Sequence, residues 1–221
     1  MLPMFGSDDN PDESFERRRD RMVDRLAESG RVTDPATLDA LRAVPRHEFV
    51  PEGRRGNAYA DRPLPIGDDQ TISAPHMVGI MVELLDAAPG DDVLEVGTGC
   101  GYHAAVTAEV VGSEHVYSVE YSAELAERAR ETLAELGYED VSVRVGDGRE
   151  GWPEHAPYDA AYLTCAAREF LDAVGEQLRD GGVALAPIGA RSQTLQRYRK
   201  RSDGEFDVED HGGVRFVQMR G

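Results

Sequence analysis

The chain has 221 residues, enough for one domain with a large core and an appended N-terminal piece. Its formal net charge is −18, because 42 Asp and Glu outnumber 24 Lys and Arg, and Lys200 is the single lysine. Such a surface repels nucleic acid phosphates and anionic lipid, so both are poor partners. An acidic chain with almost no lysine suggests adaptation to high salt, where molar ionic strength screens self-repulsion within about 3 Å.

The sequence carries no sign of a membrane or secretory segment. No run of about 18 apolar residues occurs, and the first residues lack the basic region and apolar core of a signal peptide. Two cysteines, Cys100 and Cys165, provide no disulfide framework. We therefore expect a cytoplasmic protein acting as a monomer, with residues 1–13, which are polar and contain proline, forming a disordered tail.

The N-terminal third is predicted to be helical, with one irregular insertion. Residues 14–29 and 35–44 have apolar side chains at helical spacing behind plausible N-caps. Residues 45–67 are rich in proline and glycine, and we predict a loop wrapping the main domain. A third helix with one apolar face is predicted at residues 78–87.

From residue 91 onward strands and helices alternate. We predict strands at 92–96, 115–120, 141–145, 160–164, 183–188, 194–199 and 214–218, and helices at 102–111, 122–136 and 168–179. Strands separated by helices imply right-handed crossovers and a mostly parallel α/β sheet. The last two strands, joined by a turn around Asp203 and Gly204, are expected to form an antiparallel edge.

A glycine-rich loop follows the first strand of this alternation. Residues 92–96 are a short apolar run typical of a buried parallel strand. Gly97, Gly99 and Gly101 then permit a sharp turn and a close backbone approach to a ligand. Strand, glycine loop and helix open a nucleotide-type site at the carboxyl end of a sheet, although an ordinary tight turn has the same pattern.

The loop departs from both common phosphate-binding patterns. In GxGxxG counted from Gly97, the third glycine position is Tyr102, which is too large for close packing of helix and strand. A GxxxxGK[ST] motif is absent, since Lys200 is the only lysine. A ligand that contains adenosine but no phosphate fits better, and S-adenosylmethionine is the obvious candidate.

Three acidic residues support this interpretation. Glu95, Glu120 and Asp147 each fall at the end of a successive predicted strand, and Glu120 lies about 20 residues after the loop, where a carboxylate can bind a ribose diol. Any one of them alone would more often be a solvated charge in so acidic a chain. Together they favour a cofactor site.

Five motifs then resemble one known family. They are QTISAPHM, VLEVGTGCGYHAA, SVEYSAELAERARETLAELGY, VRVGDGREGWPEHAPYD and GGVRFVQM. From about Arg46 to Met219 the chain resembles the protein-L-isoaspartate O-methyltransferases, which are class I S-adenosylmethionine-dependent enzymes. The segment 70–77 and the closing segment distinguish this family from other methyltransferases that share the glycine loop and acids.

The resemblance implies a repair enzyme. Such enzymes transfer a methyl group from S-adenosylmethionine to the free carboxylate of L-isoaspartyl residues in damaged proteins, and the ester then returns through a succinimide toward normal aspartate. The implied fold is a doubly wound, mostly parallel, seven-stranded Rossmann-like sheet with an N-terminal helical extension. We expect residues 14–77 to form the helices and substrate-side loop, and 78–221 the cofactor-binding domain.

The resemblance also implies site residues, with no metal among the ligands. The cofactor would be held by Glu95, Gly97, Thr98, Gly99, Gly101, Glu120, Asp147, Gly148 and Thr164. The substrate would be bound by Thr71, Ile72, Ser73, His76, Val214, Phe216 and Val217, with Ser73 at the family's active-site serine position.

The implied chemistry requires little of the side chains. An isoaspartyl carboxyl has a pKa near ~4, so it is ionised at neutral pH and needs no general base. Alignment of oxygen, methyl and sulfur remains, and positioning of this kind contributes roughly 7–11 kcal/mol. A hydroxyl such as Ser73 can orient the carboxylate with one hydrogen bond without acting as a nucleophile.

Other interpretations stay open. Ser73 could cap the helix that begins near Pro75, and His76 could be a packing or surface histidine. Residues 17–19 are expected to be a solvated helix face, and Trp152 to pack in the core or a loop. The chain could also methylate a small molecule or another carboxylate, or be a non-catalytic relative that binds only the cofactor.

Two stretches depart from the family pattern. Residues 164–170 lack the usual proline-bearing segment, and Gln218 and Met219 replace an expected Pro-Leu. Both lie where substrate would be held, so they bear on peptide affinity more than on cofactor binding. Cys100 and Cys165 follow strands that are neighbours in this fold, and we hypothesise that they lie close together beside the cofactor.

Overall fold

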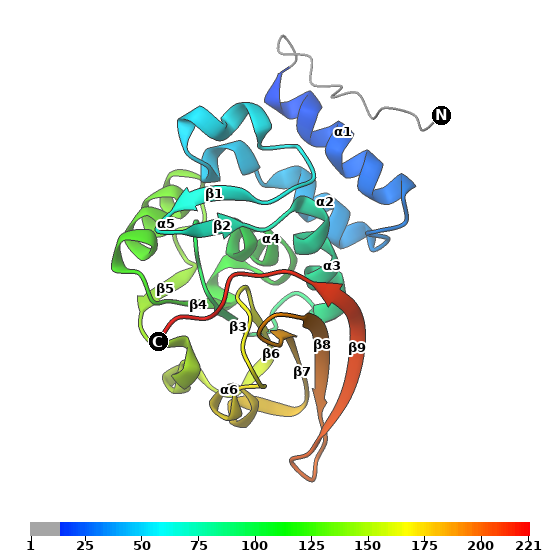
Figure 1. Cartoon of the computed structure of the whole chain (residues 1–221), viewed down its shortest axis with the longest axis vertical. Coiled ribbons are helices and arrows are strands. Elements are labelled where there is room, and N and C mark those ends of the chain that lie inside the picture. Colours follow the sequence, from blue (N-terminus) through cyan, green and yellow to red (C-terminus); the bar gives the residue numbers. More distant parts are fainter. Residues whose placement is uncertain (1–13) are drawn as a thin grey trace.

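The computed structural model describes residues 14–221, and the tail expected at 1–13 lies outside the described residues. One seven-stranded sheet has the order β5-β4-β3-β6-β7-β8-β9, and β1 and β2 form a separate antiparallel hairpin (Figure 1). The strands are β1 (Leu64–Gly67), β2 (Gln70–Ile72), β3 (Val93–Val96), β4 (Val116–Glu120), β5 (Ser142–Val145), β6 (Tyr158–Leu163), β7 (Leu178–Ile188), β8 (Gln193–Lys200) and β9 (Phe206–Val214).

The order of the strands confirms the predicted doubly wound sheet. The five neighbouring strands β5, β4, β3, β6 and β7 are parallel, while β8 and β9 add an antiparallel edge. The chain runs outward from β3 through β4 to β5, then returns to place β6 on the other side of β3. The order therefore reverses between β3 and β6, and ligands of such sheets bind at the carboxyl ends next to that reversal.

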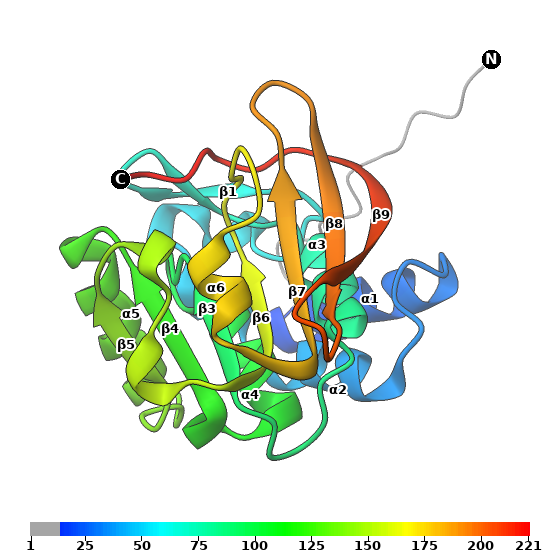
Figure 2. The ribbon, with the colours of Figure 1, turned by 90° about the horizontal axis from the view of Figure 1, so that it is seen from below.

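The helices flank this sheet (Figures 1 and 2). They are α1 (Phe15–Glu28), α2 (Pro35–Ala43), α3 (Pro75–Leu85), α4 (Tyr102–Val111), α5 (Ala123–Glu135) and α6 (Asp172–Glu176), with 3-10 turns at Arg46–Phe49, Glu52–Asn57, Ser113–His115, Gly148–Glu150 and Pro153–His155. The side chains of Ser14, Asp34 and Ser122 cap α1, α2 and α5 by accepting a backbone N–H of the first turn.

Alternating residues of the strands divide the core into two layers. Val93 packs in the cluster that contains side chains of α1 to α4, whereas its neighbour Leu94 packs in the opposite cluster with Val174 of α6. The first cluster joins residues on both sides of position 77, such as Leu41 and Ala105. The functional division into 14–77 and 78–221 stays a prediction.

The loop predicted at 45–67 is more regular than its composition indicated. It contains two 3-10 turns and ends in β1, which pairs with β2 across a tight turn. In β1, Leu64 and Ile66 point into the core while Pro65 and Gly67 are exposed. The proline and glycine content favours a loop, but an edge strand tolerates proline on its exposed face.

Two further predictions near the C-terminus are wrong. The helix expected at 168–179 is only Asp172–Glu176, because Ala166 and Ala167 form isolated β-bridges and strand β7 already begins at Leu178. The strand expected at 214–218 is replaced by β9, which ends at Val214. The antiparallel hairpin around Asp203 and Gly204 is confirmed.

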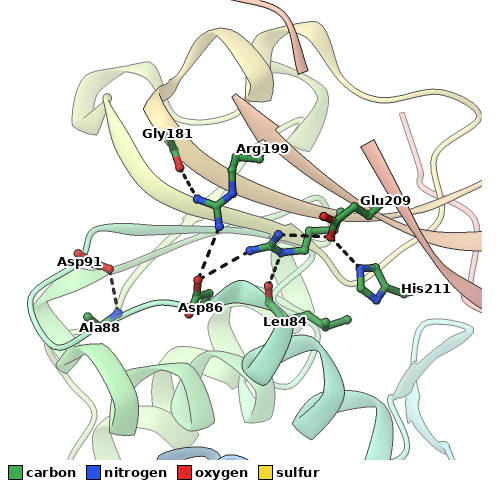
Figure 3. Close-up of polar contacts among 9 residues, drawn as sticks. Leu84, Asp86, Ala88, Asp91, Gly181, Arg199, Glu209 and His211 are labelled. Atoms are coloured by element: carbon green, nitrogen blue, oxygen red, sulfur yellow. Dashed lines mark hydrogen bonds and ion pairs between the residues drawn. The ribbon is translucent and has the colours of Figure 1, made fainter. Parts of the chain in front are cut away.

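An ionic cluster fastens the β8–β9 edge to the end of α3 (Figure 3). The Arg197 side chain, of which 13% is exposed, donates from Nε to the Leu84 carbonyl at 2.9 Å and lies 3.8 Å from Asp86 and 3.4 Å from Glu209. Arg199 also contacts Asp86, at 3.6 Å. Arginine donors near the last carbonyls of a helix satisfy groups that lack intrahelical partners, so the cluster attaches the second half of β8 to the C-terminal end of α3.

Across residues 14–221, no helix combines the length and the apolar character that a bilayer crossing requires.

Candidate functional site

A cavity of about 810 Å³, partly open to solvent, lies at the carboxyl ends of β3, β4 and β6, where the strand order reverses. The β1–β2 hairpin and the tail after β9 cross the same end of the sheet (Figure 1). The lining residues are Ile66, Gln70, Thr71, Ile72, Ser73, Val78, Val96, Gly97, Thr98, Gly99, Cys100, Tyr102, His103, Val119, Glu120, Tyr121, Gly148, Thr164, Cys165, Val217, Gln218, Met219 and Arg220.

The glycine loop forms the floor of this cavity. Gly97 has φ +101, and its N–H donates to the Val119 carbonyl at 2.8 Å. A Cβ on Gly97 would lie 2.3 Å from Thr164 Oγ1, and one on Gly148 would lie 2.3 Å from a methyl of Val96. Close packing therefore requires both glycines, and without side chains they let a ligand approach the backbone.

The Glu120 carboxylate braces the loop from the neighbouring strand. One oxygen accepts the Gly99 N–H at 2.8 Å, and the other accepts the Ser122 N–H at 2.9 Å. Glu120 is 7% exposed and lines the cavity at the end of β4. Each carboxylate oxygen has a further lone pair, so Glu120 can hold the loop and bind hydroxyl groups of a ligand at the same time.

Glu95 lies beneath the cavity instead of in its wall. It is the third residue of β3, is fully buried, and accepts hydrogen bonds from Ser118 and Tyr162. Ser118 also hydrogen bonds to Thr98 of the glycine loop, and Tyr162 to Thr107 of α4. Burial raises the pKa of Glu95 to about 8. This network connects the loop to the sheet, so Glu95 acts on the loop through Ser118 and Thr98.

Asp147 is also outside the cavity wall. Its carboxylate forms an ion pair with Arg149, and the hydrogen bond from Arg149 holds the pKa of Asp147 below its ordinary value. The adjacent Gly148 does line the cavity. Gly101 is likewise absent from the lining, since it packs against Leu133 of α5.

On the substrate side, Ser73 lines the cavity with Thr71 and Ile72. The helix that follows begins at Pro75 with Ala74 as its N-cap, and no side chain caps it. The Ser73 hydroxyl forms no hydrogen bond to any group in residues 14–221, so it is not the helix cap and is available to a ligand.

Three other residues expected on the substrate side do not line the cavity. His76 hydrogen bonds to Asp61 through Nδ1 at 2.7 Å. Val214 is the last residue of β9, and Phe216 is held by Gln193, whose side chain bonds to both the N–H and the carbonyl of Phe216. Val217, which was also expected to bind the substrate, does line the cavity.

The C-terminal tail closes one side of the cavity. The Ala166 N–H donates to the Val217 carbonyl at 2.8 Å, and the Met219 N–H donates to the Ala166 carbonyl at 2.9 Å. Arg220 then forms an ion pair with Asp68 in the β1–β2 turn at 2.8 Å. A hydrogen bond from Ser122 and the Arg220 guanidinium keep the pKa of Asp68 below its ordinary value. The tail thus joins the two walls of the cavity.

The charges in the cavity suit a nucleoside that carries no phosphate. The charged lining side chains are Glu120 and Arg220, and Arg220 is engaged by Asp68. Burial raises the pKa of Cys100 to about 11 and that of Cys165 to about 12, so both thiols are neutral. A carboxylate for a diol, a close-approach glycine loop and no free cation for a phosphate fit S-adenosylmethionine. Both cysteines line this cavity, as the hypothesis of their proximity requires.

Several lining residues were not predicted. Tyr121 directly follows Glu120 and is 54% exposed, so an aromatic residue after the strand-end acid was a usable signal. The His103 ring packs against that of Tyr162, with centroids 4.4 Å apart and planes tilted by 32°, and burial lowers the pKa of His103 to about 3. The family resemblance placed Met219 where substrate would be held, whereas no pattern indicated that Arg220 returns to the cavity.

Fold and site together define a Rossmann-like methyltransferase. A family model described as protein-L-isoaspartate(D-aspartate) O-methyltransferase matches residues 17–221. Protein-L-isoaspartate O-methyltransferase 2 of Archaeoglobus fulgidus is 51% identical over 208 residues, covering 94% of each chain. The Methanopyrus kandleri protein-L-isoaspartate O-methyltransferase is 49% identical over 213 residues, covering 95% of this chain and 94% of that one. The chain belongs to the protein-L-isoaspartate(D-aspartate) O-methyltransferase family.

Solved structures agree with this assignment. A protein-L-isoaspartate O-methyltransferase superposes with a TM-score of 0.83 at 31% identity, covering 92% of this chain and 66% of that one. A beta-aspartate methyltransferase (PCMT) from Plasmodium falciparum, in complex with S-adenosyl-L-homocysteine, superposes with a TM-score of 0.79 at 21% identity. The match covers 91% of this chain and 98% of that one. The second likeness concerns the fold.

The buried network predicts a pH-dependent stability. Glu95 keeps its proton up to about pH 8 in the folded state but loses it near pH 4.5 when unfolded. Between these values the folded state binds more protons, so this contribution to the free energy of unfolding falls as pH rises, by up to about 1.4 kcal/mol per pH unit. Denaturant unfolding of wild type and Glu95→Gln from pH 5 to 9 measures it. The free energy of wild type should decline relative to that of the variant, and a constant difference would contradict the assignment.

Proposed function

We propose that this protein methylates the free carboxylate of L-isoaspartyl residues in damaged proteins, with S-adenosylmethionine as methyl donor. One observation carries the proposal: the cavity combines the Glu120-braced glycine loop with the free hydroxyl of Ser73. Membership of the isoaspartyl methyltransferase family supports the same reaction.

The protein's part in this reaction is to bind and orient. The glycine loop admits the cofactor closely, and Glu120 accepts hydrogen bonds from its ribose. Bound S-adenosylmethionine supplies an electrophilic methyl group. Ser73 donates one hydrogen bond to the isoaspartyl carboxylate and fixes the attacking oxygen. A neutral donor leaves the carboxylate more nucleophilic than a cation would, and alignment supplies much of the rate.

The two segments that depart from the family pattern make contacts that stabilise the fold. Gln218 donates to the carbonyls of Gly189 and Ala190, at 3.3 and 3.2 Å, and so ties the tail to the β7–β8 turn. Phe170 stacks on Tyr198 with ring centroids 4.0 Å apart, away from the cavity. We propose that both departures preserve the substrate-side geometry and leave peptide binding intact.

The proposed reaction is tested with a matched pair of peptides. One contains a single L-isoaspartyl residue, and its twin contains aspartate at the same position. We expect a methyl ester on the first peptide alone, because the twin presents its side-chain carboxylate on a different backbone. Transfer to a small carboxylate instead would favour the alternative methyltransferase, and cofactor binding without transfer would favour the non-catalytic relative.

The role of Ser73 is tested by Ser73→Ala. Loss of one orienting hydrogen bond should lower kcat/KM for the isoaspartyl peptide by about 10- to 100-fold, corresponding to roughly 1.5–3 kcal/mol. The dissociation constant of S-adenosylmethionine, measured by calorimetry, should change less than threefold. Equal losses in turnover and in cofactor affinity would show that Ser73 is structural.

We propose further that the enzyme works in a salt-rich cytoplasm as a monomer, and that nucleic acid is not a partner. The support is the charge of −18 and the single lysine, since a protein of this charge is destabilised by its own repulsion unless salt screens it. The proteins that it would repair are those of the same compartment.

Salt adaptation predicts a melting midpoint that rises between dilute buffer and molar KCl. Screening should stabilise the folded state because most of the excess carboxylates are exposed on it, and the formal net charge of the chain is −18. Circular dichroism melts at fixed pH measure the midpoint, with sucrose as a control for excluded solutes. A midpoint independent of KCl would contradict the proposal.

A further inference from the structure

Most arginine side chains of this acidic protein are paired with a carboxylate or a carbonyl. Examples are Arg31 with Asp61 at 2.6 Å and Arg130 with Glu127 at 2.9 Å. A few exposed arginines have neither a hydrogen bond nor an ion pair from the side chain within residues 14–221. They are Arg17, Arg25, Arg54, Arg168, Arg191 and Arg215.

Three of these belong to chain segments that meet beside the cavity. Arg168 follows Ala167, whose N–H donates to the Pro187 carbonyl and whose carbonyl accepts the Gly189 N–H. Arg191 lies in the turn after Gly189. These contacts hold the start of the 166–168 segment against the β7–β8 turn.

Arg215 belongs to the third segment at this junction. It precedes Phe216, whose N–H and carbonyl are both bonded by the Gln193 side chain. Next along the chain, the Val217 carbonyl accepts the Ala166 N–H. We refer to Arg168, Arg191 and Arg215 as the arginine rim.

The arginine rim adjoins the substrate side of the cavity. Val217 and Gln218 line the cavity two and three positions after Arg215, and Cys165 lines it three positions before Arg168. The Gln218 side chain joins this wall to the carbonyl of Ala190, next to Arg191. These contacts place the three segments that carry the arginine rim along one side of the cavity.

The local charge is opposite to that of the whole molecule. The three segments 166–169, 189–192 and 214–218 contain the rim arginines and one carboxylate, Glu169, while the chain carries 42 acidic against 24 basic residues. Arginine presents a planar fork of donors that matches a carboxylate. With no partner within residues 14–221, these forks are available to a carboxylate that arrives with the substrate.

We propose that the arginine rim binds acidic side chains that flank the isoaspartyl residue, so that the enzyme selects acidic peptides. The inference rests on the proposed function and narrows its substrate class. An acidic peptide is repelled at long range by a molecule of charge −18. Contacts with the arginine rim offset this repulsion locally. In molar salt, screening leaves strong interactions only between charges within about 3 Å of one another.

The test compares two isoaspartyl peptides that differ only in flanking Glu or Gln residues. The ratio of kcat/KM for the Glu peptide to that for the Gln peptide is measured at a fixed KCl concentration. For the wild type we expect a ratio of roughly three to ten, the size of effect that two or three exposed ion pairs produce. In R168Q/R191Q/R215Q the ratio should fall to about one.

A matched control removes the same charge elsewhere. R17Q/R25Q/R54Q neutralises the unpaired arginines away from the cavity and should keep the wild-type ratio. Calorimetric binding of S-adenosylmethionine to each variant checks that the fold is retained. Equal changes of the ratio in both variants, or a wild-type ratio of one with both peptides methylated, would overturn the role of the rim. Methylation of neither peptide would overturn the proposed function instead.

Discussion

The site depends on the two hydrogen bonds that the Glu120 carboxylate accepts from backbone amides. One comes from Gly99 in the loop after β3, and the other from Ser122 at the start of α5. A single side chain at the end of β4 thereby fixes the loop and the helix that begins beside it. Parallel strands bring these backbone ends to one edge, and the carboxylate sets their spacing. A ribose hydroxyl bound there meets a group that is already oriented.

A second layer of polar groups supports the loop from below. Glu95, Ser118 and Thr98 connect the centre of β3, the centre of β4 and the loop, while Tyr162 extends the network to α4 through Thr107. A buried carboxyl is costly unless it is neutral and hydrogen bonded. The raised pKa of Glu95 meets this condition at neutral pH. The neutral network holds the loop without adding charge beneath the cofactor.

Local sequence sufficed for features that local chemistry determines. The alternation of strands and helices, the glycine loop and Glu120 follow from short patterns, and the structure confirms the mostly parallel, doubly wound sheet of seven strands. Glu95 is expected among the cofactor ligands from its place at the end of a predicted strand and from the family resemblance, but as the third residue of β3 it is fully buried in the core.

Long-range contacts determine the features that sequence missed. The strand β1 exists because it pairs with β2, and the tail after β9 is held by Arg220 pairing with Asp68 across 152 positions. Phe170 did not continue a helix, since stacking on Tyr198 places it against the sheet. Patterns of neighbouring residues carry no information about partners so distant. The substrate side, built from such contacts, was therefore harder to predict than the cofactor side.

The distribution of charge within the cavity gives the two sides different tasks. The lining carboxylate, Glu120, lies on the cofactor side, where a negative field favours a cationic methyl donor. The lining residues that precede Ser73 in the sequence and can hydrogen bond, Gln70 and Thr71, are neutral, and the lining cation Arg220 is paired with Asp68. An anionic acceptor would be repelled by a second carboxylate and made less nucleophilic by a close cation. Neutral donors avoid both effects, so a molecule of charge −18 can still bring its anionic substrate to the methyl group.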